Sequence, residues 1–352
     1  MAGTVGLGQE ADPSNPNELL LKDYHPQSIY QIPQTSIDRA RFPVIDMHTH
    51  VYAKTPPQIA AWIKTMDEVG VQKCIILTGT TGSDFDGIYK MYAQYLDRFE
   101  LWCGFDYTGY DKAGFGAAAV KELERCYRVG ARGVGELGVK GKGLFYSKPT
   151  KAWGMHLDDP RMNPLLEKCA ELSMPINIHV ADPKWMYEPM DATNDGLMNA
   201  YKWRLDNQPD AIGHSGMISI LERAVKRHPK TTFIACHFAN CSHDLNRLGQ
   251  LFDQCPNLYA DISARYAETA PIPRFTAQFY QRYQDRLVYG TDMGTSKRMY
   301  RITLRILETA DEHFYAQDYF TYHWPLHGLN LSDEILKKVY QQNAARILAP
   351  KP

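Results

Sequence analysis

Short apolar runs and amphipathic stretches alternate along the chain after its first 40 residues. Apolar and β-branched residues predict eight strands, at 43–47, 72–77, 100–105, 131–137, 175–180, 231–237, 257–263 and 286–292. Between them, apolar residues recur at helical spacing. The clearest stripes are Ile59, Trp62, Ile63, Met66 and Val69 in one stretch, and Leu245, Leu248, Leu251 and Phe252 in another. Buried strands that alternate with helices are typical of parallel sheets.

Eight such units predict an α/β fold, a (β/α)₈ TIM barrel, as a single domain over residues 41–352. Residues 1–40 are expected to form a disordered or extended leader because they are small, polar and proline-containing. An open nucleotide-binding sheet is less favoured, since no Gly-x-Gly-x-x-Gly motif follows the first strand.

Two long inserts interrupt the pattern, 138–160 after the fourth strand and 181–216 after the fifth. In a barrel, loops that follow strands lie at the C-terminal face, where ligands bind. A helix is expected over 297–310, and a C-terminal helical extension is expected to begin near Ser332, whose hydroxyl can cap it.

The bulk composition narrows the class of partner. With 39 basic and 40 acidic residues the formal net charge is −1, which gives no reason to expect nucleic acid or an anionic membrane. A small-molecule substrate is therefore expected, and the sequence leaves a homo-oligomer open. The N-terminus lacks the apolar core of a secretory signal, which favours a cytoplasmic protein, with an exported and processed form as the alternative. Cys74, Cys103 and Cys236 lie in apolar runs and are interpreted as buried hydrophobic residues.

Metal-competent side chains stand at the ends of several predicted strands. The first strand ends in His48 and His50, and later strands carry Glu136, His179, His237 and Asp292. Residues two apart in a strand point the same way, so Val44, Asp46, His48 and His50 are expected to share one face. A carboxylate in an apolar strand is costly unless it is paired or bound to a metal.

In a closed barrel these strand ends meet at one mouth. Imidazole and carboxylate ligands together suit Zn²⁺ or a similar transition metal. The cofactor is therefore expected to be a divalent metal, Zn²⁺ first and Mn²⁺ as the alternative. Such a cation lowers the pKa of a bound water to about 7 and so supplies a nucleophile at neutral pH.

The order and spacing of these motifs resemble the amidohydrolase superfamily, and more closely its amidohydrolase-related branch of TIM-barrel metal-dependent hydrolases. The matching pieces are VIDMHTH, INIHVADP, FIACHFAN, LVYGTDM and VYQQNAARIL, within residues 42–349. The resemblance implies that His48, His50, His179 and Asp292 bind metal, and that Asp292 also takes a proton from the attacking water. It implies that His237 either binds a second metal or holds the water.

Glu136 matches the bridging carboxylate that binuclear members carry on the fourth strand, whereas many one-metal relatives lack it. One tight metal is favoured, and a second is left open. An ion pair of Glu136 with Arg132, Lys140 or Lys142 is the alternative, as is a helix-capping role for Asp292.

Two further residues are candidates for binding substrate. Arg265 follows the seventh strand and can grip an anion in a two-pronged fork, with a salt bridge to Glu268 or Asp261 as the alternative. His214 can line the pocket or simply pack in its loop. Asp46 can orient one of the neighbouring histidines or accept backbone hydrogen bonds.

The predicted function is a metal-dependent hydrolase that uses a metal-bound water to cleave an amide, lactone or ester-type bond. Family members that act as decarboxylases commonly follow the strand-eight aspartate with a proline-containing turn, whereas this chain has GTDMGTSKRMY, which favours hydrolysis. The alternatives are a metal-dependent decarboxylase or other lyase on the same scaffold, and a non-catalytic ligand-binding barrel.

Overall fold

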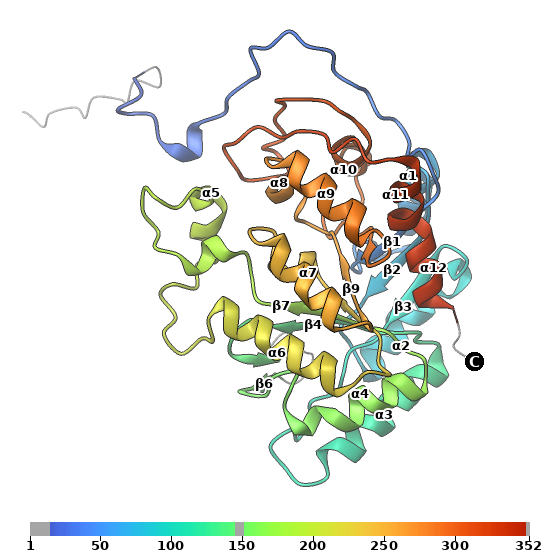
Figure 1. The fold of residues 1–352 in the computed structure, drawn as a ribbon. Coiled ribbons are helices and arrows are strands. Elements are labelled where there is room, and N and C mark those ends of the chain that lie inside the picture. The colour runs from blue at the N-terminus through green and yellow to red at the C-terminus, as the bar shows by residue number, and fades with distance from the viewer. Residues whose placement is uncertain (1–14, 145–150, 350–352) are drawn as a thin grey trace, which may run out of the picture.

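In the computed structural model, which describes residues 15–144 and 151–349, eight parallel strands form the centre of the molecule (Figure 1). They are β1 (Val44–Thr49), β2 (Val71–Leu77), β3 (Phe99–Trp102), β4 (Val134–Val139), β7 (Ile176–Val180), β8 (Phe233–Ala235), β9 (Leu258–Asp261) and β10 (Leu287–Val288). All eight lie within or overlap the strands predicted from the sequence.

The eight strands form two parallel groups, which are joined to each other by a bridge and hydrogen bonds. β1, β2 and β3 pair in parallel, and β10, β9, β8, β7 and β4 pair in a second parallel group. A parallel bridge between Cys103 and Val134 joins the end of β3 to β4. Across the other seam, the Met47 N–H donates to the Tyr289 carbonyl and the Asp292 N–H to the His48 carbonyl, both at 2.9 Å. The predicted TIM-barrel fold is confirmed.

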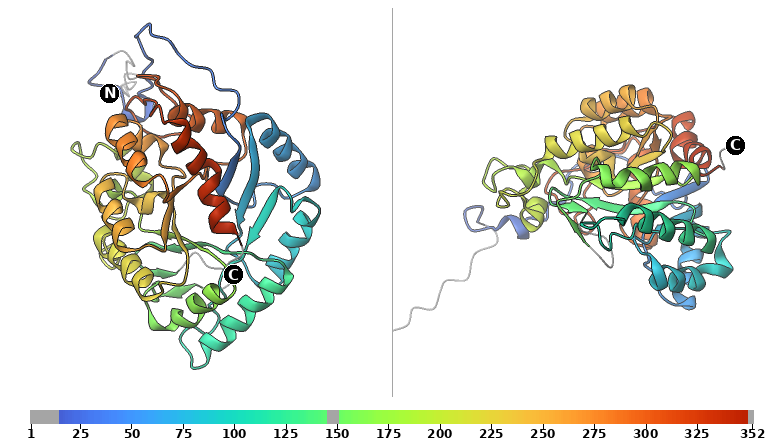
Figure 2. Two further views of the ribbon diagram at one scale, coloured as in Figure 1. Left: turned by 45° about the vertical axis from the view of Figure 1, so that its right-hand side comes forward. Right: turned by 90° about the horizontal axis from the view of Figure 1, so that it is seen from below.

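Helices surround the strands (Figure 2). The longer ones are α1 (Pro56–Val69), α2 (Gly82–Tyr92), α3 (Phe115–Val129), α4 (Asn163–Glu171), α6 (His214–Arg227), α7 (Leu245–Gln254), α9 (Pro273–Tyr283) and α10 (Lys297–Glu308). Short helical turns lie between them: η1 (Leu21–Asp23), η2 (Ala93–Tyr95), η3 (Pro160–Met162), η4 (Lys184–Tyr187), α5 (Leu197–Ala200), η5 (Tyr201–Trp203), η6 (His237–Asn240) and α8 (Tyr266–Thr269).

The predicted C-terminal extension is one continuous helical stretch made of α11 (Asp333–Lys337), the π-helical η7 (Lys338–Gln342) and α12 (Asn343–Leu348). Ser332 caps it as predicted, because its hydroxyl accepts the Ile335 N–H.

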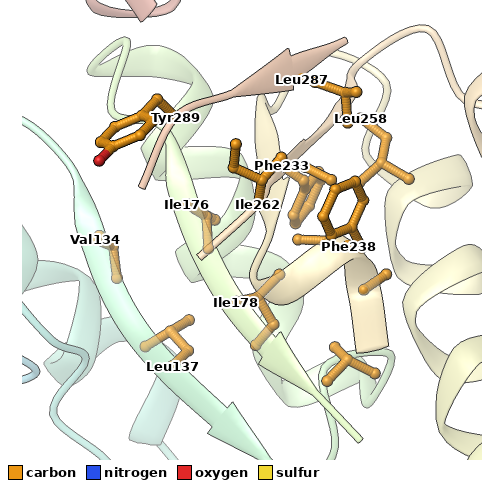
Figure 3. Close-up of a cluster of buried hydrophobic side chains, with 14 of the residues drawn as sticks. Val134, Leu137, Ile176, Ile178, Phe233, Phe238, Leu258, Ile262, Leu287 and Tyr289 are labelled. Carbon is orange, nitrogen blue, oxygen red and sulfur yellow. The ribbon is translucent and has the colours of Figure 1, made fainter. Parts of the chain in front are cut away.

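Apolar side chains on the two faces of the strands build separate clusters. The outward face packs against the helices and forms the main core, part of which is shown in Figure 3. Inside the barrel, a smaller cluster that includes Ile45, Ile75, Ile234 and Val288 is covered by Ile347 of α12. The interior is therefore apolar at the N-terminal ends of the strands, and the polar candidates are confined to the opposite end.

The predicted leader and inserts have little regular structure. Residues 15–40 run as an extended arm over the C-terminal segment, where Thr35 bonds to Asp311 through its N–H and its hydroxyl, at 2.8 and 2.6 Å (Figure 1). The first insert contains the small hairpin β5 (Gly143–Leu144) and β6 (Ala152–Trp153). Residues 1–14 of the leader and 145–150 of this insert lie outside the described residues. Among the helices described, none has the length and apolar character needed to cross a membrane.

Candidate metal centre

The six predicted metal-competent side chains converge at the C-terminal mouth of the barrel. His50 Nε2 lies 3.0 Å from Asp292 Oδ1 and 3.5 Å from Glu136 Oε2. His179 Nδ1 lies 2.7 Å from Glu136 Oε1 and 3.2 Å from His237 Nε2. His48 Nε2 completes the group at 3.8 Å from Asp292 Oδ1.

Glu136 stands between two pairs of histidines. Its Oε2 faces His50 and, at 3.9 Å, His48. Its Oε1 faces His179 and, at 3.6 Å, His237. The pairing register of β4 against β7 shifts between Val134 and Leu137, next to this residue. Within the described residues, Glu136 pairs with histidines and not with Arg132, Lys140 or Lys142. Lys140 instead bonds to Asp182 at 2.8 Å, and Arg132 donates to the Ala131 carbonyl at 2.8 Å.

Each of the four histidines has one ring nitrogen beside a protein oxygen that lies outside the six-residue group. The Nδ1 atoms of His48, His50 and His237 lie 2.9, 3.0 and 2.9 Å from Asp261, the Leu77 carbonyl and the Ser263 carbonyl, respectively. His179 uses its Nε2, 3.3 Å from Asp182 Oδ1. Assigning the ring proton to the engaged nitrogen leaves the other nitrogen of every ring as a lone pair directed into the centre.

The buried His48 Nε2 has no hydrogen-bond partner among the described residues. Potential ligand atoms form two groups, in each of which they lie within 4.8 Å of one another. One group comes from His48, His50 and Asp292, and the other from His48, Glu136, Cys236 and His237. The centre thus offers imidazole nitrogens, among them the unpartnered Nε2 of His48, and two carboxylates. These are the donors that a transition metal needs. The residues therefore fit a divalent cation.

The electrostatics of the centre also favour a cation. Burial opposes charging of His48, yet the carboxylates of Asp261, Asp292 and Glu136 raise its pKa to about 10. Burial likewise opposes ionisation of Asp292, but His48, His50 and His237 lower its pKa to about 2. A site that stabilises a protonated imidazole so strongly carries a negative potential, which a divalent cation would also experience.

Local backbone geometry brings two of these side chains into the centre. His237 and Asp292 follow the ends of β8 and β10 in left-handed conformation, with φ of 60° and 54°. Gly290 leaves room for His48, because a Cβ at this position would lie 2.8 Å from His48 Cβ. Ser296, and not Asp292, caps α10 by accepting the Met299 N–H.

A buried carboxylate that sequence reasoning missed lies beneath the centre. Asp261, at the end of β9, accepts hydrogen bonds from His48 Nδ1 at 2.9 Å, Asn177 Nδ2 at 3.1 Å and the His237 N–H at 2.9 Å. It also accepts from the Ser263 N–H at 3.1 Å and hydroxyl at 2.5 Å. Asp261 stands inside the apolar run NLYADIS, where a carboxylate is costly to bury without partners, and this position could have indicated its role.

The expectation that Asp46 shares a face with the histidines is wrong. Its carboxylate accepts from the Thr291 hydroxyl at 2.7 Å and from the Tyr300 hydroxyl of α10 at 3.3 Å. The register of β1 against β2 shifts between Asp46 and Thr49, which breaks the strand alternation at this point. Asp46 does accept backbone hydrogen bonds, from the N–H groups of His48 and Thr291.

The two predicted substrate-binding residues are engaged by the protein itself. Arg265 donates to Asn240 Oδ1 from Nε and Nη2, at 2.9 and 2.7 Å, and lies 3.5 Å from Glu268. The alternative salt bridge to Glu268 is therefore present, whereas Asp261 is bonded to His48. His214 is buried at the start of α6, with its Nε2 2.9 Å from the Asn240 carbonyl. Their contact with a substrate remains a prediction.

A cavity of about 390 Å³ opens onto the centre. Its walls include His50, Glu136, His179 and Asp292, together with Lys140 from the first insert and Trp203 from the second. Both inserts therefore reach the cavity, as their predicted place at the C-terminal face implies. A cavity of this size accommodates a small molecule.

Comparisons with known proteins agree with the geometry. A family model described as Amidohydrolase matches residues 45–349. No curated protein matches the chain. Among solved structures, 2,6-dihydroxybenzoate decarboxylase from Rhizobium is 14% identical, with a TM-score of 0.54 over 87% of this chain and 98% of that chain.

Two other structures are similar. 5-Carboxyvanillate decarboxylase from Novosphingobium aromaticivorans is 15% identical, with a TM-score of 0.54 over 90% of this chain and 99% of that chain. An uncharacterized TIM-barrel protein from Bordetella bronchiseptica is 16% identical, with a TM-score of 0.55 over 87% and 98%. At these identities the structures support the fold, while the family model covers most of the chain. The protein belongs to the amidohydrolase family of metal-dependent enzymes.

Proposed function

We propose that this protein is a metal-dependent hydrolase of a small molecule, with a centre that holds up to two divalent cations. The observation that carries the proposal is the position of Glu136, whose two oxygens face different histidine pairs. His48, His50 and Asp292 would hold one cation, and His179 and His237 the other, with Glu136 between them. A carboxylate shared by two cation positions suits two-metal hydrolytic chemistry.

When bound, divalent cations polarise a substrate carbonyl and lower the pKa of water. The chain's own residues transfer protons and contact the substrate. Asp292, beside His50 and 3.4 Å from the Tyr52 hydroxyl, accepts a proton from the attacking water at its carboxylate and passes it to the leaving group. Lys140 and Trp203 in the cavity wall contact the substrate and limit its size.

Elemental analysis of the purified protein tests the centre. We expect up to two zinc or manganese ions per chain, loss of metal in His48→Ala, and no loss in a His228→Ala control, whose ring bonds to Asn163 at 3.1 Å. A wild-type protein that stays metal-free after incubation with Zn²⁺ and Mn²⁺ would overturn the proposal.

A panel of small lactones, esters and amides, assayed in ¹⁸O-labelled water, tests the reaction. Hydrolysis places the label in the product. Asp292→Asn should retain most of the metal and lose turnover by about 10²- to 10⁴-fold, the usual contribution of a general acid or base. An active Asp292→Asn enzyme would refute the role of Asp292.

Decarboxylation is the second candidate. Two of the similar structures are decarboxylases of aromatic acids, one of them complexed with manganese. In this chemistry the centre would hold a substrate carboxylate, and the C–C bond would break without attack by water. Carbon dioxide release from hydroxylated benzoates, without incorporation of labelled oxygen, would favour this candidate over hydrolysis.

A further inference from the structure

One of the seven cysteines has surroundings unlike those of the others. All seven are free and buried. Six of them belong to the main hydrophobic cluster, namely Cys74, Cys103, Cys126, Cys169, Cys241 and Cys255. Cys236 is buried and free as predicted, but it does not belong to that cluster and has a polar neighbour.

Strand geometry places Cys236 inside the barrel. Ile234 on β8 belongs to the inner apolar cluster. Cys236 directly follows β8 with extended backbone, so its side chain points the same way as that of Ile234, two residues earlier. The Cys236 thiol lies 2.8 Å from Asn177 Oδ1, and Asn177 in turn bonds to Asp261 beneath the metal centre. Cys236 is thus part of a polar layer between the apolar interior and the centre.

The thiol also lies within reach of the cation ligands. Ligand atoms of His48, Glu136, Cys236 and His237 lie within 4.8 Å of one another. An independent observation points to a ligand at this place, because the fully buried Nε2 of His48 has no hydrogen-bond partner in the part of the chain that the structure describes. The thiol thus adds a sulfur donor, of a kind that zinc accepts, to the imidazole and carboxylate donors that meet at Glu136.

We propose that Cys236 is an additional, thiolate ligand of the centre and makes it select Zn²⁺ over Mn²⁺. The inference rests on the proposed metal-dependent function and names the cation that the centre prefers. On binding, the S–H bond breaks, the proton leaves to solvent and the sulfur electron pair forms the bond to the cation. Thiolates favour zinc, whereas carboxylate and water ligands suit manganese.

Cobalt(II) is a spectroscopic probe of this ligand. The wild-type protein loaded with Co²⁺ should show a near-ultraviolet charge-transfer band from sulfur to cobalt. Cys236→Ser should bind Co²⁺ and lack the band. Cys103→Ser should keep it, because Cys103 lies in the outer hydrophobic cluster.

Competition of each protein with a chromophoric chelator measures selectivity. Cys236→Ser should bind Zn²⁺ at least about tenfold more weakly, whereas its Mn²⁺ affinity should change little. Tenfold is the smallest usual loss when a residue that only hydrogen-bonds to a metal ligand is replaced. Wild-type protein that binds Co²⁺ without the band, or a Cys236→Ser variant with wild-type selectivity, would overturn the inference and leave the proposed function standing. Wild-type protein that binds no cation would overturn both.

Discussion

Substitution of Asp261 by asparagine tests whether the layer beneath the centre sets its metal affinity. Asp261 Oδ1 accepts three hydrogen bonds, from the His237 N–H and from the N–H and hydroxyl of Ser263. Its Oδ2 accepts two, from His48 Nδ1 and Asn177 Nδ2. An amide has one NH₂ group in place of an oxygen, so in either orientation of the new side chain at least two donors face a donor.

The cheaper orientation directs the NH₂ group towards His48. His48 can relieve the clash by moving its ring proton from Nδ1 to Nε2, which removes the lone pair directed into the centre. We expect the metal affinity to fall about 10- to 100-fold, the usual cost of losing such a partner. This corresponds to about 1.4–2.7 kcal/mol of binding free energy. Asn177 Nδ2 loses its acceptor as well, and an unsatisfied buried donor costs about 1–3 kcal/mol of stability.

Both quantities are measurable on the same preparations. Chelator competition gives the metal affinity, and urea denaturation of the metal-free protein gives the free energy of unfolding. Asp253→Asn is the matched control, because Asp253 is an exposed carboxylate that bonds to the Tyr283 hydroxyl at 3.0 Å, far from the centre in the fold. Wild-type metal affinity in Asp261→Asn would refute the argument that Asp261 fixes the tautomer of His48.

Three other local contacts can be tested by substitution. Gly290→Ala should displace His48, lower metal affinity and cost about 1–3 kcal/mol of stability through overpacking, whereas Gly213→Ala, with no atom within 4 Å of its new Cβ, should do neither. Burial lowers the pKa of His214, so its neutral form is favoured in the folded state and the free energy of unfolding should fall as pH drops below about 6.5, the unfolded value. Urea titrations should show a shallower fall in His214→Phe, and an equal slope would contradict this assignment. Ser296→Ala should lower the free energy of unfolding by about 1 kcal/mol, since its hydroxyl caps α10 at 3.1 Å, and Ser219→Ala on the exposed face of α6 is the control.

The strands and the six residues of the centre could be predicted because their signals are local. An apolar run of strand length must be buried. Burying a histidine or carboxylate at its end costs free energy unless a partner or a metal compensates, so such a residue indicates a site. The helical stripe of α7 shows the same point, since Leu245, Leu248, Leu251 and Phe252 are all buried as predicted. Side chains at the ends of such runs therefore meet at one end of the parallel strands.

What could not be predicted depends on pairing between distant segments. Asp46 was expected to point with His48, but a shift in the register between β1 and β2 reverses the alternation, and that shift is a property of the pair of strands. Arg265 was predicted to bind an anion or to pair with Glu268, and the pair with Glu268 is present. Its contact with the Asn240 side chain was not predicted, because it depends on a left-handed stretch from His237 to Asn240.

Cys236 shows why sequence neighbours can mislead about a buried side chain. Its flanking residues in FIACH are mostly apolar and suggest a hydrophobic environment. In the barrel, however, the environment of an inward side chain comes from the strands beside and across from it, here Asn177 on β7 and Glu136 on β4. Burial was therefore predictable from the apolar run, whereas polarity was not, because it is set by residues 59 and 100 positions away in the sequence. The same separation lets Cys236 contact Asn177 while the other six cysteines pack in the main hydrophobic cluster.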